Sequence, residues 1–178
     1  MLKKKVGMIS LGCPKNLVDS EIMLGLLDNN GFEITNDESE ANIIIVNTCG
    51  FIESAKQESI NTILEMAQYK NKNCELLIAA GCLAERYHDE IMEQIPEVDA
   101  VVGTGGCGGI AEVIKRAYAE DKREVQFLGG SNDISYLESG RIISSGCGYA
   151  YLKIAEGCDN CCTYCAIPGI KGRFISRK

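Results

Sequence analysis

Three cysteines occupy the same kind of position in this sequence, because each follows a short apolar run that is typical of a β-strand. They are Cys13, Cys49 and Cys82. Parallel sheets bring the carboxyl ends of neighbouring strands to one edge, so we expect these thiols to lie close together there. Three soft ligands from separate loops suit an iron–sulfur cluster better than a zinc site, which generally takes four. Buried structural cysteines, which are common in protein cores, are the alternative interpretation.

A second group of cysteines lies on one short stretch near the end of the chain. Cys158, Cys162 and Cys165 have the spacing Cys-x3-Cys-x2-Cys. Three thiolates on one tight loop can hold three irons of a [4Fe–4S] cluster and leave the fourth iron open. An open iron can chelate a small molecule and pass it one electron, which is what reductive cleavage of S-adenosylmethionine (SAM) requires. Cys161 also has a ligand spacing to Cys158 and to Cys165, and a zinc knuckle or a redox Cys-x2-Cys site is the alternative interpretation.

The composition narrows the setting of this chemistry. The 178 residues include ten cysteines and a single histidine, His88, which we expect at the surface. The basic start precedes an apolar run too short for a signal peptide, and no run of roughly 18 apolar residues indicates a membrane span. We therefore expect a cytoplasmic protein, and in that reducing compartment cysteines serve metal or redox chemistry more often than disulfides. The net charge of −7, with Lys and Arg clustered only at the ends, gives no sign of a nucleic-acid surface.

Short apolar runs alternate with helical patterns over residues 5–120, which is typical of a parallel α/β sheet. The predicted strands are Val6–Leu11, Phe32–Thr35, Asn42–Asn47, Glu75–Ala80 and Ala100–Gly103. The predicted helices are Leu17–Asn30, Ile52–Tyr69, Ala84–Ile95 and Gly109–Ala119. Asn16 is the expected N-cap of the first helix, with Asp19 three residues on. The predicted fold class is α/β, with a five-stranded parallel flavodoxin-like sheet in the order 2-1-3-4-5 and helices on both faces.

The same patterns divide the chain into three segments. Residues 1–120 form the first domain, and residues 121–148 are a linker with one or two strands of its own. Residues 149–178 begin another domain, whose first strand, Tyr149–Ala155, runs directly into the second group of cysteines. The remaining thiols are interpreted as incidental, although Cys107 would lie at the same sheet edge as the first group; they are Cys74, Cys107 and Cys147.

The sequence around the cysteines resembles the radical SAM methylthiotransferases along essentially the whole chain. The matching stretches are Ser10–Glu21 (SLGCPKNLVDSE), Asn47–Ile52 (NTCGFI), Gly81–Leu83 (GCL) and the Cys-x3-Cys-x-aromatic-Cys segment that ends at Cys165. The resemblance implies that a [4Fe–4S] cluster on the second group of cysteines, Cys158, Cys162 and Cys165, binds and cleaves SAM, with Tyr164 near the adenine. It further implies that a [4Fe–4S] cluster on Cys13, Cys49 and Cys82 carries or donates sulfur, while another SAM supplies the methyl group.

The opening motif separates two branches of that family. Residues 12–16 read Gly-Cys-Pro-Lys-Asn, which is the form of the RimO-type branch. That branch modifies the β-carbon of an aspartate in a small-subunit ribosomal protein. The branch that acts on transfer RNA usually opens Gly-Cys-Gln-Met-Asn and stays the alternative. The resemblance also implies a reductant such as flavodoxin or ferredoxin, and no membrane partner.

The chain departs from the family in its extent. It stops at Lys178, just after the segment that would hold the SAM-binding cluster. The rest of the radical SAM barrel and the C-terminal substrate-binding domain of the family are not in this sequence. A radical reaction needs its reactants aligned in a pocket that excludes water. We therefore expect no methylthiolation by this segment alone.

Two other classes of protein compete with this interpretation. Residues 103–108 fit the Gly-x-Gly-x-x-Gly pattern of a dinucleotide-binding oxidoreductase, but they follow the fifth predicted strand and not the first strand of a Rossmann half. An iron–sulfur module that only transfers electrons is the second competitor. A simple electron carrier usually closes its cluster with four cysteines, whereas the second group here leaves one iron open.

Overall fold

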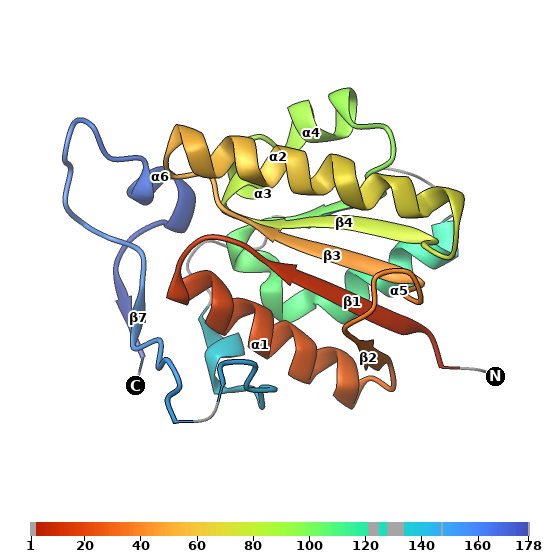
Figure 1. Cartoon of the computed structure of the whole chain (residues 1–178). Coiled ribbons are helices and arrows are strands. Elements are labelled where there is room, and N and C mark those ends of the chain that lie inside the picture. Colours follow the sequence, from red (N-terminus) through yellow and green to blue (C-terminus); the bar gives the residue numbers. More distant parts are fainter. Residues whose placement is uncertain (1–2, 121–124, 128–133, 147, 178) are drawn as a thin grey trace.

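The computed structural model contains a parallel β-sheet whose strands lie between Lys5 and Phe127 (Figure 1). The structure describes residues 3–120, 125–127, 134–146 and 148–177. The sheet has six strands in the order β2-β1-β3-β4-β5-β6, and every neighbouring pair is parallel. The strands are β1 (Lys5–Ser10), β2 (Glu33–Thr35), β3 (Ile43–Thr48), β4 (Leu76–Gly81), β5 (Ala100–Val102) and β6 (Val125–Phe127).

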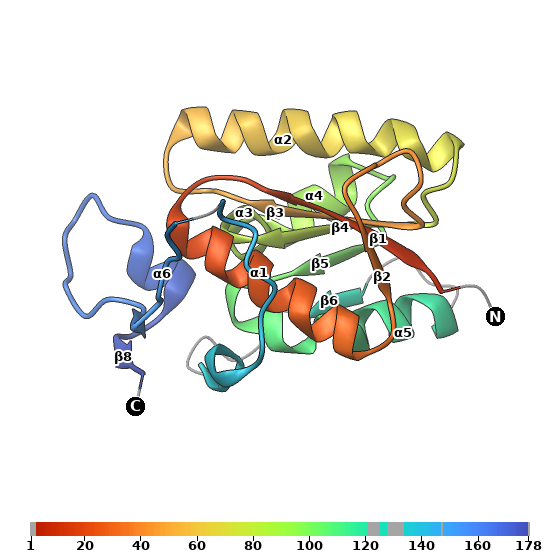
Figure 2. The ribbon, with the colours of Figure 1, turned by 60° about the horizontal axis from the view of Figure 1, so that its bottom comes forward.

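Helices cover both faces of this sheet, with α1 and α5 on one face and α2, α3 and α4 on the other (Figure 2). The α-helices of this domain are α1 (Pro14–Asn29), α2 (Glu53–Ala67), α3 (Cys82–Arg86), α4 (His88–Gln94) and α5 (Ile110–Glu120). Short 3₁₀ helices are η1 (Gln68–Asn71), η2 (Thr104–Gly109) and η3 (Ser135–Glu138). Among the described residues, no helix has the length and apolar character needed to cross a bilayer.

The two faces of the sheet explain why its central strands read as unbroken apolar runs. In β3, Ile43 and Ile45 pack toward α1 and α5, whereas Ile44 and Val46 pack toward α2. All four side chains are fully buried. Successive residues of a strand point to opposite faces, so a strand that is covered on both sides needs an apolar residue at every position.

The predicted flavodoxin-like parallel sheet is confirmed, and β6 adds a sixth strand beside β5 from within the predicted linker. The predicted helix Ala84–Ile95 is wrong as one element, because Tyr87 leaves helical geometry (φ −133°, ψ 36°) and separates α3 from α4. The predicted cap of the first helix is also wrong. Cys13 holds the N-cap position and Pro14 follows it, because the fixed φ of proline suits the first helical turn.

The chain after η3 returns along α1 to the edge of the sheet where β1, β3 and β4 end (Figure 1). It contains β7 (Ala155–Glu156), α6 (Ile167–Lys171) and β8 (Ile175–Ser176). The strand predicted at Tyr149–Ala155 is wrong over most of its length. Strand pairing needs a hydrogen-bonded neighbour, and the two-residue β8 pairs only with Ala155 and Glu156.

Candidate functional site

The three cysteines of the first group line one cavity of about 610 Å³ at the carboxyl edge of the sheet. Cys13 follows β1, Cys49 follows β3, and Cys82 follows β4. These strands are neighbours in the order β1-β3-β4, which is why their ends open onto the same space. Within the described residues, no three Cys, His, Asp or Glu side chains meet the geometry of a single bound metal ion. The cysteines surround a space larger than one ion, and their role as cluster ligands stays a prediction.

Two glycines allow the cysteine loops to come together. Gly12 has φ +86°, and a Cβ there would lie 2.7 Å from the Cβ of Cys49. Gly81 has φ +90°, and a Cβ there would lie 2.6 Å from the carbonyl oxygen of Thr48. A side chain at either position would therefore combine backbone strain with overlap. The buried hydroxyl of Ser59 accepts a hydrogen bond from the amide of Cys49 and donates one to its carbonyl, both at 3.0 Å.

Asn16 links the loops that carry all three cysteines, a role that sequence reasoning missed. Its Nδ2 donates to the carbonyl oxygens of Leu11 at 3.2 Å and Thr48 at 2.8 Å. Its Oδ1 lies 3.8 Å from the Sγ of Cys82. The side chain is almost fully buried, so these contacts fix the cavity wall from inside the fold. The signal in the sequence was a side-chain amide three residues after Cys13, which was interpreted as a helix N-cap.

The cavity walls are apolar, and this affects the thiols. Burial raises the pKa of Cys82 to about 11, while Lys171 acts in the opposite direction. The neighbouring Cys49 and Cys13 raise this pKa further. Cys82 is therefore a neutral thiol at pH 7 when nothing is bound. A metal that binds there must displace the proton, because the thiolate is the ligand.

The C-terminal segment closes this cavity from the side opposite the sheet. The segment contributes lining residues from β7, from the residue after β7 and from α6; they are Ala155, Glu156, Gly157, Ile167, Ile170 and Lys171. α6 packs against α3 and η2, and Figure 2 shows it beside the start of α1. The cavity therefore lies between the sheet domain and the segment that carries the second group of cysteines.

A buried network of charges joins these two parts. Asp19 of α1 accepts hydrogen bonds from Lys153 Nζ at 2.7 and 2.9 Å and from Tyr136 OH at 3.2 Å. Lys171 Nζ lies 3.5 Å from Asp19 and 3.6 Å from Glu156, which also pairs with Lys153. All five side chains are less than 10% exposed. Buried charges need such partners, because an unpaired ion in a protein interior is very costly.

The second group of cysteines lies on the loop between β7 and α6. Cys158 and Cys165 are half-buried, whereas Cys161 and Cys162 are exposed. Cys158 N donates to Gly172 O at 3.1 Å, which ties down the start of the loop, and Cys165 N donates to Cys162 O at 3.0 Å in a turn within the loop. None of these residues lines the cavity of the first group, so the described structure keeps the two groups in separate places. Tyr164, predicted to lie near SAM, is 88% exposed.

The other described thiols are core residues. Cys107 lies in η2 with its Sγ 3.6 Å from the carbonyl oxygen of Thr104, and burial raises its pKa to about 12. Cys74 is buried as well, and burial raises its pKa to about 11. Neither lines the cavity. Cys147 lies outside the described residues.

The amide of Thr104, in the glycine-rich stretch after β5, already has a carboxylate partner. The stretch forms η2, in which Thr104 N donates to the carboxylate of Glu85 at 2.8 Å. The hydroxyl of Thr104 donates to Ile170 O at 2.9 Å, so α6 packs directly on this turn. A carboxylate where a phosphate would bind argues against the dinucleotide-binding alternative. His88 is half-buried at the start of α4, with Nδ1 3.4 Å from the carbonyl of Glu85, and lies less exposed than predicted.

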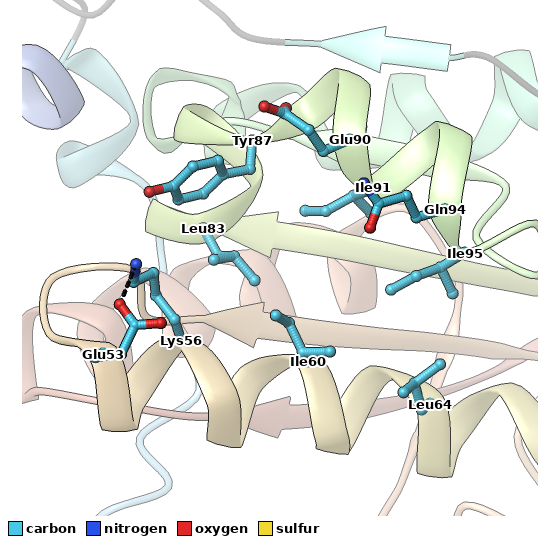
Figure 3. Close-up of a pocket in the computed structure, with 10 residues that line it drawn as sticks. All are labelled: Glu53, Lys56, Ile60, Leu64, Leu83, Tyr87, Glu90, Ile91, Gln94 and Ile95. Atoms are coloured by element: carbon cyan, nitrogen blue, oxygen red, sulfur yellow. Dashed lines mark ion pairs between the residues drawn. The ribbon is translucent and has the colours of Figure 1, made fainter.

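A second cavity, of about 400 Å³, lies between α2 and the helices α3 and α4 (Figure 3). Aliphatic side chains form its floor, including Ile60, Leu83 and Ile91. Glu53 and Lys56 form an ion pair at one end of the groove. Its lining includes no thiol, unlike that of the cysteine cavity.

The fold and the site define an α/β domain whose parallel sheet carries three thiols at its carboxyl edge. Comparison with known proteins agrees with this description. A model of the family described as "Uncharacterized protein family UPF0004" matches residues 5–103, and the chain belongs to that family. Relatives named "Ribosomal protein uS12 methylthiotransferase RimO" match almost the whole chain. They come from Acetivibrio thermocellus (66% identical over 182 residues), Clostridium perfringens strain 13 (56% over 178) and Trichlorobacter lovleyi (50% over 178).

These relatives extend well beyond the match. Each alignment covers 99% of this chain but only 39 to 40% of the relative, so the chain spans about two fifths of the length of the curated relatives it matches. The resemblance to the methylthiotransferases that the cysteine motifs indicate is confirmed.

Proposed function

We propose that this chain is the front part of a radical SAM methylthiotransferase that adds a methylthio group to the β-carbon of an aspartate in ribosomal protein uS12. The observation that carries the proposal is the cavity between the sheet domain and the second cysteine segment, with Cys13, Cys49 and Cys82 in its wall. The names of the relatives and the Gly-Cys-Pro-Lys-Asn opening support the ribosomal-protein substrate. Transfer RNA is the less favoured substrate.

The residues of the cavity fit a [4Fe–4S] cluster. Three thiols, no histidine and mostly apolar walls make a soft donor set, which iron–sulfur clusters prefer. Cys13, Cys49 and Cys82 would hold this cluster, which supplies sulfur chemistry when bound. Asn16 keeps the three loops in register, and Ile167 and Ile170 exclude water from the side of α6.

Cys158, Cys162 and Cys165 would hold the second [4Fe–4S] cluster, which supplies the electron for SAM cleavage when bound. Gly157 shapes the start of this loop, because it has φ +75° and a Cβ there would lie 2.0 Å from the carbonyl oxygen of Arg173. Tyr164 is free to contact the adenine of SAM. The reductant would be a flavodoxin or a ferredoxin, and the reaction would take place in the cytoplasm.

Anaerobic reconstitution tests the two cluster sites. The chain should bind about eight irons and eight sulfides, at about four of each per cluster. A variant with Cys13, Cys49 and Cys82 all changed to Ala should lose half of both. Cys74→Ala is the matched control, because this thiol is buried but lies outside the cavity. Full iron content in the triple variant would show that the first site is misassigned.

The substrate is tested with the full-length protein that contains this segment. Small ribosomal subunits, SAM and a strong reductant should give a methylthio mass increase on uS12 that mass spectrometry detects. The same reaction with transfer RNA tests the alternative substrate, and a product there alone would overturn the proposal. An electron-transfer module would give neither product, and SAM would leave its EPR signal unchanged.

A further inference from the structure

The two lysines of the buried network differ in one respect. Lys153 and Lys171 both pair with Asp19 and Glu156, and both are less than 10% exposed. Lys171 also lines the cysteine cavity, whereas Lys153 does not. The fold therefore places one of two otherwise similar lysines in the wall of the cavity that the first group of cysteines lines.

We propose that Lys171 is a positioning residue for the cluster on Cys13, Cys49 and Cys82: Asp19 and Glu156 hold its ammonium group in the cavity wall, where its fixed positive charge stabilises the anionic thiolates and cluster. The inference rests on the proposed function, because it assumes that these cysteines hold a cluster. A residue of α6, the helix that follows the second cysteine loop, would then affect the chemistry of the first site.

The ammonium group keeps its charge in this position. Burial alone would lower the pKa of Lys171, but the carboxylates of Asp19 and Glu156 outweigh burial and raise that pKa above its ordinary value. Lys171 is therefore cationic at any pH at which the protein functions. Charges interact strongly where water is excluded, and groups around a metal site tune its redox potential in the same way.

Lys171 lines the same cavity as Cys13, Cys49 and Cys82. Only 7% of this residue is exposed, so solvent and salt screen its charge little. Lys15, the other cation that lines the cavity, is exposed, so solvent and salt screen its charge.

A purely structural role for Lys171, in which it only fastens α6 to α1, predicts a different outcome from the proposed role. Lys171→Met and Lys153→Met both remove a cation from the same ion-pair network, so both should destabilise the docked segment. Only Lys171→Met removes a charge from the cavity wall. The redox potential of the first cluster separates the two roles, because loss of a fastening alone would affect both variants alike.

The experiment uses the whole chain with Cys158, Cys162 and Cys165 changed to Ala, so that only the first cluster assembles. Its midpoint potential is measured by EPR-monitored titration in this background and in the added variants Lys171→Met, Lys171→Arg and Lys153→Met. Reduction adds negative charge, which a nearby cation stabilises. We therefore expect a more negative potential for Lys171→Met, a potential near the parent value for Lys171→Arg, and a smaller shift for Lys153→Met.

Equal potentials in the parent and Lys171→Met would overturn the inference, and so would equal shifts in the two methionine variants. If Lys171→Met does not fold, Lys171→Gln takes its place, because it removes the charge but keeps a hydrogen-bond donor. Failure of the proposed function has a different signature. In that case the parent background binds no iron at all, which refutes the cluster assignment together with the inference.

Discussion

Lys153 Nζ lies 2.7 Å from Asp19 Oδ1, and this buried contact joins residues 134 positions apart in the chain. Asp19 belongs to α1, whose N-cap is Cys13, and Lys153 lies five residues before Cys158. One ion pair thus ties the start of the first cysteine site to the approach of the second. The segment that carries the second group is docked on the sheet domain through charge as well as through apolar contact.

Removal of Asp19 should release this segment. In Asp19→Leu, Lys153 and Lys171 stay buried with Glu156 as their remaining carboxylate, and breaking a buried pair in this way costs about 3–5 kcal/mol. We expect a lower free energy of unfolding in urea and faster proteolysis after residue 139. Asp28→Leu is the control, because Asp28 is an exposed acid on the same helix. Equal proteolysis of the two variants would show that the network does not hold the segment.

Gly12→Ala should prevent the first cluster from assembling. The added Cβ would overlap Cys49, and the positive φ adds strain of about 1–2 kcal/mol. Gly31→Ala is a matched control, because Gly31 has φ +87° and no atom within 4 Å of the added Cβ. Both variants should lose similar stability from backbone strain. Iron content after reconstitution should fall in Gly12→Ala only, and a loss in Gly31→Ala as well would point to a general folding defect.

Docking of the C-terminal segment should weaken in acid. Burial alone would raise the pKa of Glu156, but Lys171 and Lys153 outweigh burial and hold it below its ordinary value of 4.5. A carboxyl group with a lowered folded-state pKa stabilises the fold above its unfolded pKa, and this contribution is lost as pH falls through the folded value. We therefore expect stability to decline below about pH 4.5.

Urea unfolding at a series of pH values measures this effect, and Glu156→Gln should show a flatter decline in acid than the parent protein. Lys171 sets the high-pH limit of the range in which the network stabilises the fold. Its pKa is raised above 10.5, so its contribution is complete below that pH and is lost as pH rises through the folded value. The network should therefore be constant across the neutral range. A decline that Glu156→Gln leaves unchanged would assign the acid sensitivity to other carboxylates.

Substitution of the two exposed cysteines of the second loop, Cys161 and Cys162, should show which of them is a cluster ligand. Cys161→Ala should keep a SAM-responsive cluster, whereas Cys162→Ala should lose it. The reason is spacing, because only Cys162 gives Cys-x3-Cys-x2-Cys with Tyr164 directly before the last ligand. Both thiols are exposed, so neither substitution should disturb the fold. Iron analysis and the EPR response to SAM measure the outcome, and the reverse pattern would make Cys161 the ligand.

The sequence by itself determined the sheet and the place of the cysteines on it. The run Ile43–Val46 predicts a strand covered on both faces, and a cysteine after each of three neighbouring strands predicts convergence at one edge. These features depend on local periodicity and on the rules of parallel sheets, which a single sequence displays. The cysteine motifs are likewise short stretches of sequence, so a single sequence displays them as well.

Only the tertiary structure decided how the two cysteine segments meet. Asn16 and Asp19 have the pattern of a helix start, yet Asn16 bonds to Thr48 and Asp19 binds Lys153. Lys171 looks like an ordinary solvated lysine in sequence, but it lies buried in the cavity wall. Long-range pairing and burial depend on where the whole chain folds back, and no local pattern encodes that. For this reason the thiols were predictable from the sequence, and the charges that surround them were not.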